Sequence, residues 1–343
     1  MKKEKNLKLS DLGEFGFIAR FSTSFLRNLP PEVVGIGDDC AVVPWKGKKK
    51  LLVTTDLLID GVHFLKEKIS AEDLGYKSLA VNLSDIAAMG GRPLYALLSL
   101  ALAPETDVRW LDQFFNGWRA LARKTKVQLL GGDTTKTLNK MVINVALLGE
   151  AEENFIRYRS AAEPGDIIAV TGPLGNSEGG LRLILSGLRE SQLGSDEKKL
   201  LKCHYRPRPH LPEGYFLAHQ LEVRAMMDVS DGIDSDLKRI IERSNCGVEV
   251  WLEKLPVSSF LKKCSQKYGW PLNEVAAAGG EDYCLLVTID PNGFSRLALR
   301  YQRQFRRPLY PIGRITSDRG HFIYLLNGRP VALKKSGYDH FKT

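Results

Sequence analysis

Hydrophobic positions in the first half of the chain alternate between short apolar runs and longer segments with helical spacing. Residues 72–89 form a mostly apolar segment that stops at Gly90-Gly91, which is a typical helix end. In residues 108–124, large apolar side chains recur every three or four positions, so this segment is predicted to be a helix that faces a core. The predicted strands are residues 51–55, 94–103, 127–130 and 141–148.

The pattern breaks at residues 150–153, where charged residues replace apolar ones. We therefore predict two domains, residues 1–150 and 151–343, which agrees with a length of 343 residues. A polar stretch at residues 191–199 is expected to be exposed, and a proline-rich connector follows at residues 206–209. In the second half, the predicted strands are residues 166–171, 225–229, 248–252, 283–289 and a β-rich end from residue 309, with a helix at residues 233–244 and another after the glycines of residues 172–180.

Composition and charge narrow the class of protein. Hydrophobic residues make up 43% and charged residues 26%, which is typical of a globular protein and excludes disordered and fibrous classes. The longest apolar run, residues 94–103, is too short for a membrane helix. A net charge of +9 suits nucleic acid or phosphorylated small molecules, but a solvated basic surface explains it equally well.

The ends of the chain and its cysteines indicate a reducing compartment. The N-terminus is basic and lacks the apolar core of a signal peptide. Five cysteines lie far apart with no CxxC spacing, so neither a disulfide framework nor structural zinc is expected. These features predict a cytoplasmic protein without membrane attachment.

Aspartates gather at the predicted ends of apolar elements, beside glycine and hydroxyl residues. An unpaired buried carboxylate is costly, so Asp56 after a buried strand and Asp85 inside an apolar helix each need a cation, donors or solvent. Mg²⁺ prefers hard oxygen ligands, and the Thr54 and Thr55 oxygens suit the same shell. The five motifs are GIGDD (35–39), TTD (54–56), NLSD (82–85), GGDTT (131–135) and DVSDG (228–232).

Each motif taken alone also allows a purely structural role. Gly37-Asp38-Asp39 suits a turn, Asp133 suits the end of a strand, and Ser230 or Asp231 suits a helix N-cap. A single histidine such as His63 is more often structural than functional. Five such motifs in one chain nevertheless favour a site where metal ions meet phosphate groups.

Other nucleotide and nucleophile motifs are absent from the sequence. It contains no GxxxxGK[ST] and no protein-kinase motif, and Gly35-Ile36-Gly37 is followed by Cys40 where a dinucleotide fingerprint needs a glycine. No serine or cysteine has the setting of a covalent nucleophile. The sequence therefore predicts no catalytic residue acting as a covalent nucleophile or general base.

Taken together, these motifs resemble those of the thiamine-monophosphate kinase family, which belongs to the superfamily of aminoimidazole ribonucleotide synthetase and selenophosphate synthetase. The resemblance covers nearly the whole chain, and the order and spacing of the motifs make it specific. It rests on LGEF (12–15), GIGDDCAVV (35–43), TTDLLIDGVHF (54–64), YKSLAVNLSDIAAMGG (76–91), LLGGDTT (129–135), VTGPLGNSEGGL (170–181), MDVSDG (227–232), GGEDY (279–283) and GYDHF (337–341).

The resemblance implies an α/β (α+β) fold of two domains and a direct phosphoryl transfer. ATP and thiamine monophosphate would give ADP and thiamine diphosphate, with several Mg²⁺ ions as cofactors. The N-terminal domain would hold metal and ATP on a mixed sheet with helices on one face, and would form a barrel-like interface in a homodimer. The C-terminal α/β domain, also with a mixed sheet, would complete the nucleotide and substrate site.

The resemblance also implies roles for individual residues. The metal positions are Asp39, Thr54, Thr55, Asp56, Asp85, Asp133, Asp228 and Asp231. The nucleotide positions are Gly132, Asp133, Arg159 and Ser230, and the substrate positions are His63, Glu281 and Tyr338. Because a phosphate acceptor is already largely ionised at neutral pH, the reaction needs neutralisation and alignment rather than a strong base.

Two alternatives remain at this point. Another ATP-dependent synthetase of the superfamily shares the metal motifs, although the GVHF, GGEDY and GYDHF segments favour the thiamine enzyme. A basic nucleic-acid-binding protein would need a basic stripe with exposed aromatic residues, whereas carboxylates gather at the glycine turns here. The preferred hypothesis has no nucleic-acid partner.

Overall fold

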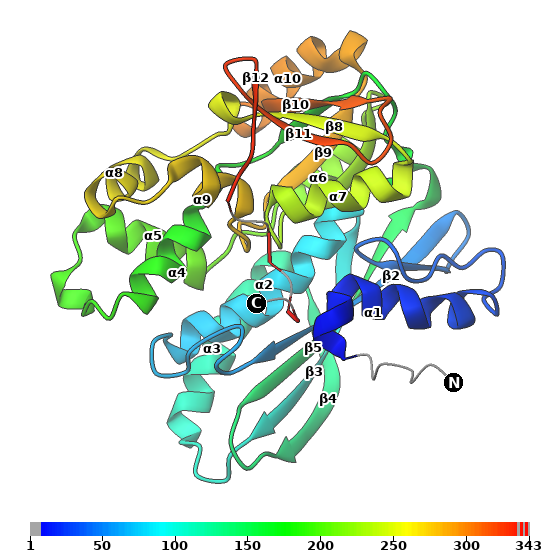
Figure 1. Ribbon diagram of the computed structural model, residues 1–343. Helices are drawn as coiled ribbons and strands as arrows, with labels where there is room; N and C mark the ends of the chain where they lie inside the picture. The colour runs from blue at the N-terminus through cyan, green and yellow to red at the C-terminus, as the bar shows by residue number, and fades with distance from the viewer. Residues whose placement is uncertain (1–7, 335–336, 339, 342–343) are drawn as a thin grey trace, which may run out of the picture.

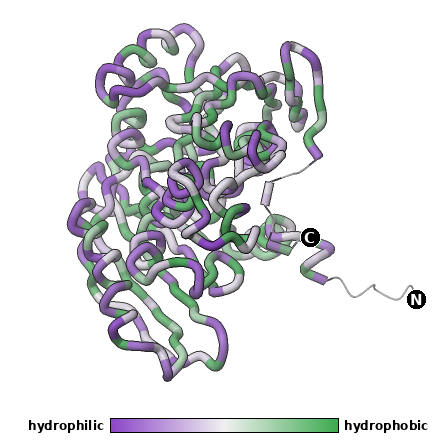
Figure 2. The backbone as a smooth tube through the Cα atoms, turned by 90° about the vertical axis from the view of Figure 1, so that its left-hand side faces the viewer, coloured by the Kyte–Doolittle hydropathy of each residue, from purple (hydrophilic) through white to green (hydrophobic). Residues whose placement is uncertain are grey.

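The computed structural model describes residues 8–334, 337–338 and 340–341, which form two sheets with helices around them (Figure 1). The basic residues 2–7 and Asp339 of the C-terminal motif lie outside the described residues. No helix in these ranges is long and apolar enough to cross a membrane. Along the backbone, hydrophobic and hydrophilic positions are mixed throughout (Figure 2).

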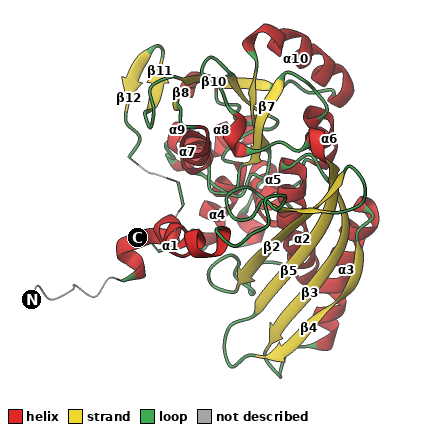
Figure 3. Cartoon of the chain, turned by 90° about the vertical axis from the view of Figure 1, so that its right-hand side faces the viewer, coloured by secondary structure: helices red, strands yellow, loops and turns green. Residues whose placement is uncertain are grey.

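The first sheet has the order β1-β2-β5-β3-β4 and is mixed, since β3 and β4 are parallel and the other pairs antiparallel. Helices α2 and α3 cover one face of this sheet, while α1 lies beside its β2 side (Figure 3). The elements are α1 (Leu9–Leu26), β1 (Ala41–Pro44), β2 (Lys49–Ile59), α2 (Ala71–Ala88), β3 (Arg92–Leu102), α3 (Val108–Thr125), β4 (Gln128–Lys136) and β5 (Val142–Glu152).

The second sheet has the order β12-β11-β8-β10-β6-β9-β7 and is also mixed, with β11 parallel to β8. Its strands are β6 (Ile167–Val170), β7 (Val223–Asp228), β8 (Gly247–Trp251), β9 (Leu285–Ile289), β10 (Tyr310–Thr316), β11 (Phe322–Leu326) and β12 (Arg329–Val331). The helices of this half are α4 (Asn176–Leu185), α5 (Ser195–Tyr205), α6 (Leu211–Ala218), α7 (Ile233–Ser244), α8 (Ser259–Tyr268), α9 (Leu272–Ala278) and α10 (Pro291–Phe305). Short 3₁₀ turns lie at Glu153–Phe155, Arg159–Ala161, Glu190–Gln192 and Leu252–Lys254.

Helix α2 is the central element of the fold. It begins after Ser70, whose hydroxyl accepts the Asp73 N–H at 3.1 Å, and it buries 14 of its 18 residues. One side of it packs into the core of the first sheet, and its end at Ala87 and Ala88 joins an apolar cluster with residues of the second half. Because α2 is buried on nearly all sides, few of its positions can hold polar residues.

Several predictions are confirmed by the structure, and the mixed sheet with helices on one face is among them. The helix over Ile233–Ser244 has the predicted bounds, α2 differs from its predicted bounds by one residue at each end, and α3 ends one residue later than predicted. The charge break at residues 150–153 coincides with the end of β5, and a domain boundary after residue 150 stays a prediction.

Four expectations were wrong in their local detail. Strand β2 continues to Ile59, so Asp56 lies within a strand and not after one. Strand β4 continues to Lys136, so Asp133 also lies within a strand. Tyr283 precedes β9 instead of belonging to it. The stretch at residues 191–199 is only partly exposed, because Glu197 is buried and accepts from Lys267 at 2.6 Å.

Candidate active site

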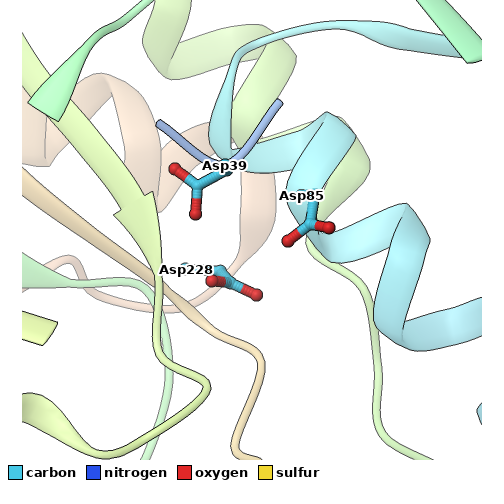
Figure 4. A group of neighbouring side chains, drawn as sticks. All are labelled: Asp39, Asp85 and Asp228. Carbon is cyan, nitrogen blue, oxygen red and sulfur yellow. The ribbon is translucent and has the colours of Figure 1, made fainter. Parts of the chain in front are cut away.

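Three carboxylates from distant parts of the sequence meet between the two halves (Figure 4). Asp39 lies just before β1, Asp85 near the end of α2, and Asp228 at the end of β7. One oxygen from each lies within 4.8 Å of the others. The spacing fits a divalent cation held by carboxylate oxygens, which is the donor set that Mg²⁺ prefers.

Burial and mutual repulsion make this group costly without a cation. Burial, together with Asp56 and Asp228, raises the pKa of Asp85 well above its ordinary value. Burial and then Asp39 do the same to the pKa of Asp228, and burial raises the pKa of Asp56 to about 6. A bound cation would favour the charged forms of all these carboxylates.

Hydroxyl groups and one arginine partly satisfy the cluster in the structure. Thr54 Oγ1 donates to Asp85 at 2.5 Å, and Ser84 Oγ donates to Asp228 at 2.6 Å. Arg159 donates from Nη2 to Asp39 at 2.7 Å and from Nε at 3.3 Å, which raises the pKa of the guanidinium. Arg159 is therefore the counter-ion of Asp39 in this structure.

Asp56 is held by an amide of α2 that the sequence pattern did not reveal as functional. The Asp56 N–H donates to Asn82 Oδ1 at 3.1 Å, and Asn82 Nδ2 donates to the Ser78 carbonyl at 3.2 Å. Asn82 is fully buried, so its amide links the strand of Asp56 to the helix of Asp85. A polar residue one turn before Asp85 in an apolar helix is the signal that identifies it.

Asp133 and Gly132 lie away from the carboxylate cluster of the same chain. Two strands, β5 and β3, separate β2 from β4. Asp133 is in register with Ser99, Asn144 and Leu57, on the face that α2 and α3 leave open, whereas Asp56 alternates with Leu57 and faces the helices. The structure therefore does not bring Asp133 to Asp56 within one copy.

Thr55 and Gly132 belong to the same open face and edge. Thr55 is exposed there, and its hydroxyl accepts from Asn144 Nδ2 at 2.8 Å. Gly132 allows β4 to approach β3 closely, because a Cβ at this position would lie 1.7 Å from the Leu98 carbonyl oxygen. The GGDTT motif is thus an exposed edge strand and not a turn.

A cavity of about 1060 Å³ opens beside the cluster, between the two halves. It is large enough for a phosphorylated organic molecule. Among the residues that line it are Asp56, His63, Ser230, Asp231, Glu281 and Tyr338. The structure therefore places all three predicted substrate residues and the predicted nucleotide residue Ser230 around one cavity.

The GGEDY segment fixes Glu281 in this cavity through a constrained backbone. Glu281 and Tyr283 have φ values of 62° and 50°, in the left-handed region that non-glycine residues seldom adopt. The Glu281 N–H donates to the Ser230 carbonyl at 2.7 Å. Asp282 between them accepts from the N–H groups of Gly175 at 2.5 Å and Ser177 at 3.2 Å.

The Asp282 carboxylate also binds the glycine-rich turn before α4. Its carboxylate occupies the N-terminus of α4, where free N–H groups would otherwise attract an anion. Burial raises the pKa of Asp282 to about 7, although the hydrogen bonds from Gly175, Ser177 and Asn176 oppose the rise. This helix end therefore anchors the Glu281 loop.

His63, shortly after β2, and Tyr338, near the C-terminus, both line the cavity. The Ile59 N–H donates to His63 Nδ1 at 3.0 Å, and burial lowers the pKa of this imidazole. A neutral ring that accepts at Nδ1 carries its proton on Nε2, which leaves a donor for a ligand. The Tyr338 N–H donates to the Asp231 carbonyl at 3.2 Å, and the Tyr338 side chain is half exposed.

The helix α7 that follows DVSDG contributes a buried carboxylate that sequence reasoning missed. Gly232, not Ser230 or Asp231, is the N-cap of α7, and the Asp231 carboxylate accepts from Arg239 Nη2 at 3.1 Å. Asp236 is fully buried, and neither of its carboxylate oxygens has a hydrogen-bond partner among the described residues. Burial, then Asp231 and Asp228, raise its pKa well above the ordinary value, so the protonated form is favoured.

Comparison with known proteins agrees with this geometry over both halves. Residues 37–151 match the family model "AIR synthase related protein, N-terminal domain". Residues 163–325 match "AIR synthase related protein, C-terminal domain".

Full-length relatives narrow the family further. The chain is 39% identical to the thiamine-monophosphate kinase of Haemophilus influenzae over 335 residues, which is 96% of this chain and 98% of the relative. A solved structure described as "AaThiL complexed with AMPPCP and TMP" has a TM-score of 0.84 and 33% identity, covering 98% of this chain and all of that one. Thiamine monophosphate kinase from Aquifex aeolicus has a TM-score of 0.78 and 32% identity, covering 95% of this chain and 99% of that one. The chain therefore belongs to the AIR synthase related protein family and, within it, to the thiamine-monophosphate kinases.

Proposed function

We propose that this protein transfers the γ-phosphoryl group of ATP to thiamine monophosphate, giving ADP and thiamine diphosphate, with Mg²⁺ as the cofactor. The observation that carries the proposal is the joint position of the Asp39, Asp85 and Asp228 cluster and the cavity with Glu281. A related structure of the same fold was solved with AMPPCP and TMP. The chemistry and the relative thus agree on an ATP-dependent reaction of a phosphate acceptor.

One group of site residues would neutralise the negative charge of ATP and of the acceptor phosphate. A second group would hold the organic part of thiamine monophosphate. When bound, Mg²⁺ neutralises phosphate oxygens and orients them for in-line displacement. The carboxylates of Asp39, Asp85 and Asp228 fit this ion, and Asp56, Asp231, Thr54 and Thr55 are the further ligands that we propose. Arg159 adds charge beside Asp39, and Ser230 lines the cavity where the nucleotide would enter.

No general base is needed in this reaction. The acceptor oxygen belongs to a phosphate whose second pKa is about 6, so it is largely ionised at neutral pH. His63, Glu281 and Tyr338 then hold and orient the thiamine part, with the Tyr338 ring suited to stacking on a cationic ring.

The direct test is an assay of the purified protein with ATP and millimolar Mg²⁺. Either thiamine monophosphate or free thiamine serves as the acceptor, and thiamine diphosphate is measured itself. We expect product from the monophosphate only, and none after chelation with EDTA. ATP binding without product from either acceptor would refute the proposed substrate and leave other acceptors of the family to be tried.

We also propose that the protein is a homodimer in which the open face of the first sheet is the interface. Four leucines on or beside this face are exposed in the single chain, a large apolar surface for a protein that stays monomeric. They are Leu57, Leu97, Leu129 and Leu130. A twofold arrangement of these sheets would be barrel-like, and it would bring β4 of one copy near β2 of the other.

This arrangement gives Asp133 and Gly132 their proposed roles at the nucleotide and metal. Within one chain, Asp133 lies on the open face two strands away from β2. In a dimer, Asp133 of a second copy would meet Thr55 on the open face, next to Asp56 in the chain, so each active site would use both copies. The separation of Asp133 from the cluster in the single chain is what supports this proposal.

Mixing two inactive variants tests the shared site. Asp133→Asn and Asp85→Asn are each expected to be inactive, but a heterodimer of them has one site with neither substitution. Since random mixing makes half of the dimers mixed, activity should recover to about a quarter of the wild-type value. The control mixes Asp56→Asn with Asp85→Asn, which lie on the same side and should give no recovery. Recovery in the control, or none in the test pair, would contradict a site built from two copies.

A further inference from the structure

Lys77 is a fully buried lysine whose role the reaction has not yet explained. Its side chain on α2 is only 1% exposed. Nζ lies 2.9 Å from Glu281 Oε1 and 3.1 Å from Oε2, and this pair joins the first half of the chain to the second. A buried ammonium is costly and is kept only where a charged partner offsets its desolvation.

The partner carboxylate is itself fixed from several sides. The Glu281 backbone is held by Ser230, and the neighbouring Asp282 is held by the N-terminus of α4. His204 Nδ1 lies 3.2 Å from Glu281 Oε2 and forms a hydrogen bond with Ser177 Oγ at 2.9 Å, and burial lowers the pKa of His204 to about 4, so the imidazole is neutral. Lys77 is therefore the charged group that faces Glu281 at this end of the cavity.

Glu281 retains acceptor capacity after these contacts. A carboxylate has about four acceptor positions, and the Lys77 contacts use one on each oxygen. The Glu281 side chain remains 26% exposed and lines the cavity. A remaining position suits an N–H donor or a cationic ring of the acceptor.

The position of Lys77 on its helix argues against direct contact with the transferred phosphate. Lys77, Val81 and Ser84 have the i, i+4, i+7 spacing of one helix face, and Ser84 is the residue that donates to Asp228. Lys77 is thus two turns away from the carboxylate cluster, with Val81 between them along the cavity wall.

We propose that Lys77 is a positioning residue: it holds the Glu281 carboxylate across the cleft, and Glu281 in turn binds the nitrogen-containing rings of the acceptor. This inference rests on the proposed function, because it assigns the organic part of thiamine monophosphate to the Lys77–Glu281 end of the cavity. Lys77 also lines the cavity, but in this assignment it acts through Glu281 and not on the acceptor or the nucleotide.

A double-mutant cycle with Lys77→Met and Glu281→Gln tests the proposal. Lys77→Met should raise the KM for thiamine monophosphate about tenfold, with less than about a twofold change in the KM for ATP. In the Glu281→Gln background, adding Lys77→Met should change the KM by less than about twofold, because the residue through which it acts is already altered. Equal effects in both backgrounds would overturn the proposal.

Free thiamine, used as a competitive inhibitor, distinguishes the two ends of the acceptor. If Lys77 acts through Glu281 on the rings, its substitution weakens inhibition by thiamine as much as it raises the KM for the monophosphate. If Lys77 instead contacts the phosphate, thiamine inhibition stays unchanged, and the proposal is wrong.

Three further proteins keep the experiment decisive. Lys77→Arg retains the charge and should recover most of the affinity for thiamine monophosphate. If Lys77→Met alone fails to fold, the double variant, which replaces the ion pair with two uncharged side chains, takes its place. Lys262→Met removes a charge from the exposed side of α8, outside the cavity, and should leave both KM values unchanged. The wild type must form thiamine diphosphate in the same assay, so that a wrong substrate is not mistaken for a wrong role of Lys77.

Discussion

Replacing Asp85 by asparagine should reduce phosphoryl transfer by at least about a thousandfold while the fold remains intact. Asp85 lies on the buried helix α2, and one of its carboxylate oxygens lies within 4.8 Å of oxygens of Asp39 and Asp228. An amide has the same shape but one oxygen fewer and no charge, so the site loses a ligand and much of its attraction for Mg²⁺. The loss should appear in kcat/KM measured over a range of Mg²⁺ concentrations.

The same substitution should leave the metal-free protein at least as stable as the wild type. The pKa of Asp85 is raised in the folded state, first by burial and then by Asp56 and Asp228. For a raised carboxyl pKa, folding stability falls as the pH rises above the unfolded value, so the charged carboxylate is destabilising near neutral pH. The uncharged amide of the Asp85→Asn variant removes this cost, and the melting temperature without metal should be equal or higher.

Adding Mg²⁺ separates the two effects of this substitution. We expect the ion to raise the melting temperature of the wild type and to have little effect on Asp85→Asn. Asp112→Asn, on the exposed side of α3, is the matched control and should behave as the wild type in both measurements. Near-normal turnover of Asp85→Asn would exclude Asp85 as a metal ligand.

Replacing Gly117 by alanine should destabilise the whole first half of the chain. Helices α2 and α3 cross with backbone against backbone: a Cβ at Gly117 would lie 1.8 Å from the Glu72 carbonyl oxygen. A Cβ at Gly75, on the other helix, would lie 1.9 Å from the Phe114 carbonyl oxygen. Neither contact can be relieved by turning a side chain, so the helices must separate.

Separation of the helices would disturb the packing of Phe114, Trp118 and Leu121, which are buried beneath this crossing. Overpacking typically costs about 1–3 kcal/mol, and a clash with a backbone carbonyl belongs at the upper end of this range. The melting temperature should fall by roughly 5 °C or more, measured by circular dichroism. Gly16→Ala on α1 is the control, since its Cβ would meet only the Leu12 side chain, at 3.3 Å. An unchanged melting temperature for Gly117→Ala would contradict the close crossing.

The sequence predicted the elements whose pattern follows from burial. Helix α3 has one apolar stripe and α2 an apolar sequence with a glycine stop, so both were recognisable. Helix α1 was not, because glycines interrupt it and several of its large apolar residues, such as Phe21 and Phe25, are exposed. Hydrophobic sequence patterns of this kind reveal only helices whose apolar residues are buried within a single chain.

The candidate site was predictable where local sequence carries the signal. Aspartates beside glycine and hydroxyl residues identified Asp39, Asp85 and Asp228, which the structure brings together. The extension of β2 through Asp56 was not visible, because a buried strand with a carboxylate on its covered side forms only where Asn82 and the site support it. Lys77 could not be assigned either, since its partner Glu281 lies 204 residues away in the sequence.

Helix α2 gives the active site a fixed length. Lys77 and Asp85 are eight residues apart on it, which corresponds to about 12 Å along the helix axis. At one end of this segment, Lys77 holds Glu281, which would orient the rings. At the other end, Asp85 is one carboxylate of the acidic cluster. Under the proposed function, an acceptor would have to span this distance. Thiamine without a phosphate would then not reach the acidic end, and an acceptor that already has two phosphates would extend beyond it. The rigidity of one buried helix would therefore decide how many phosphates the product carries.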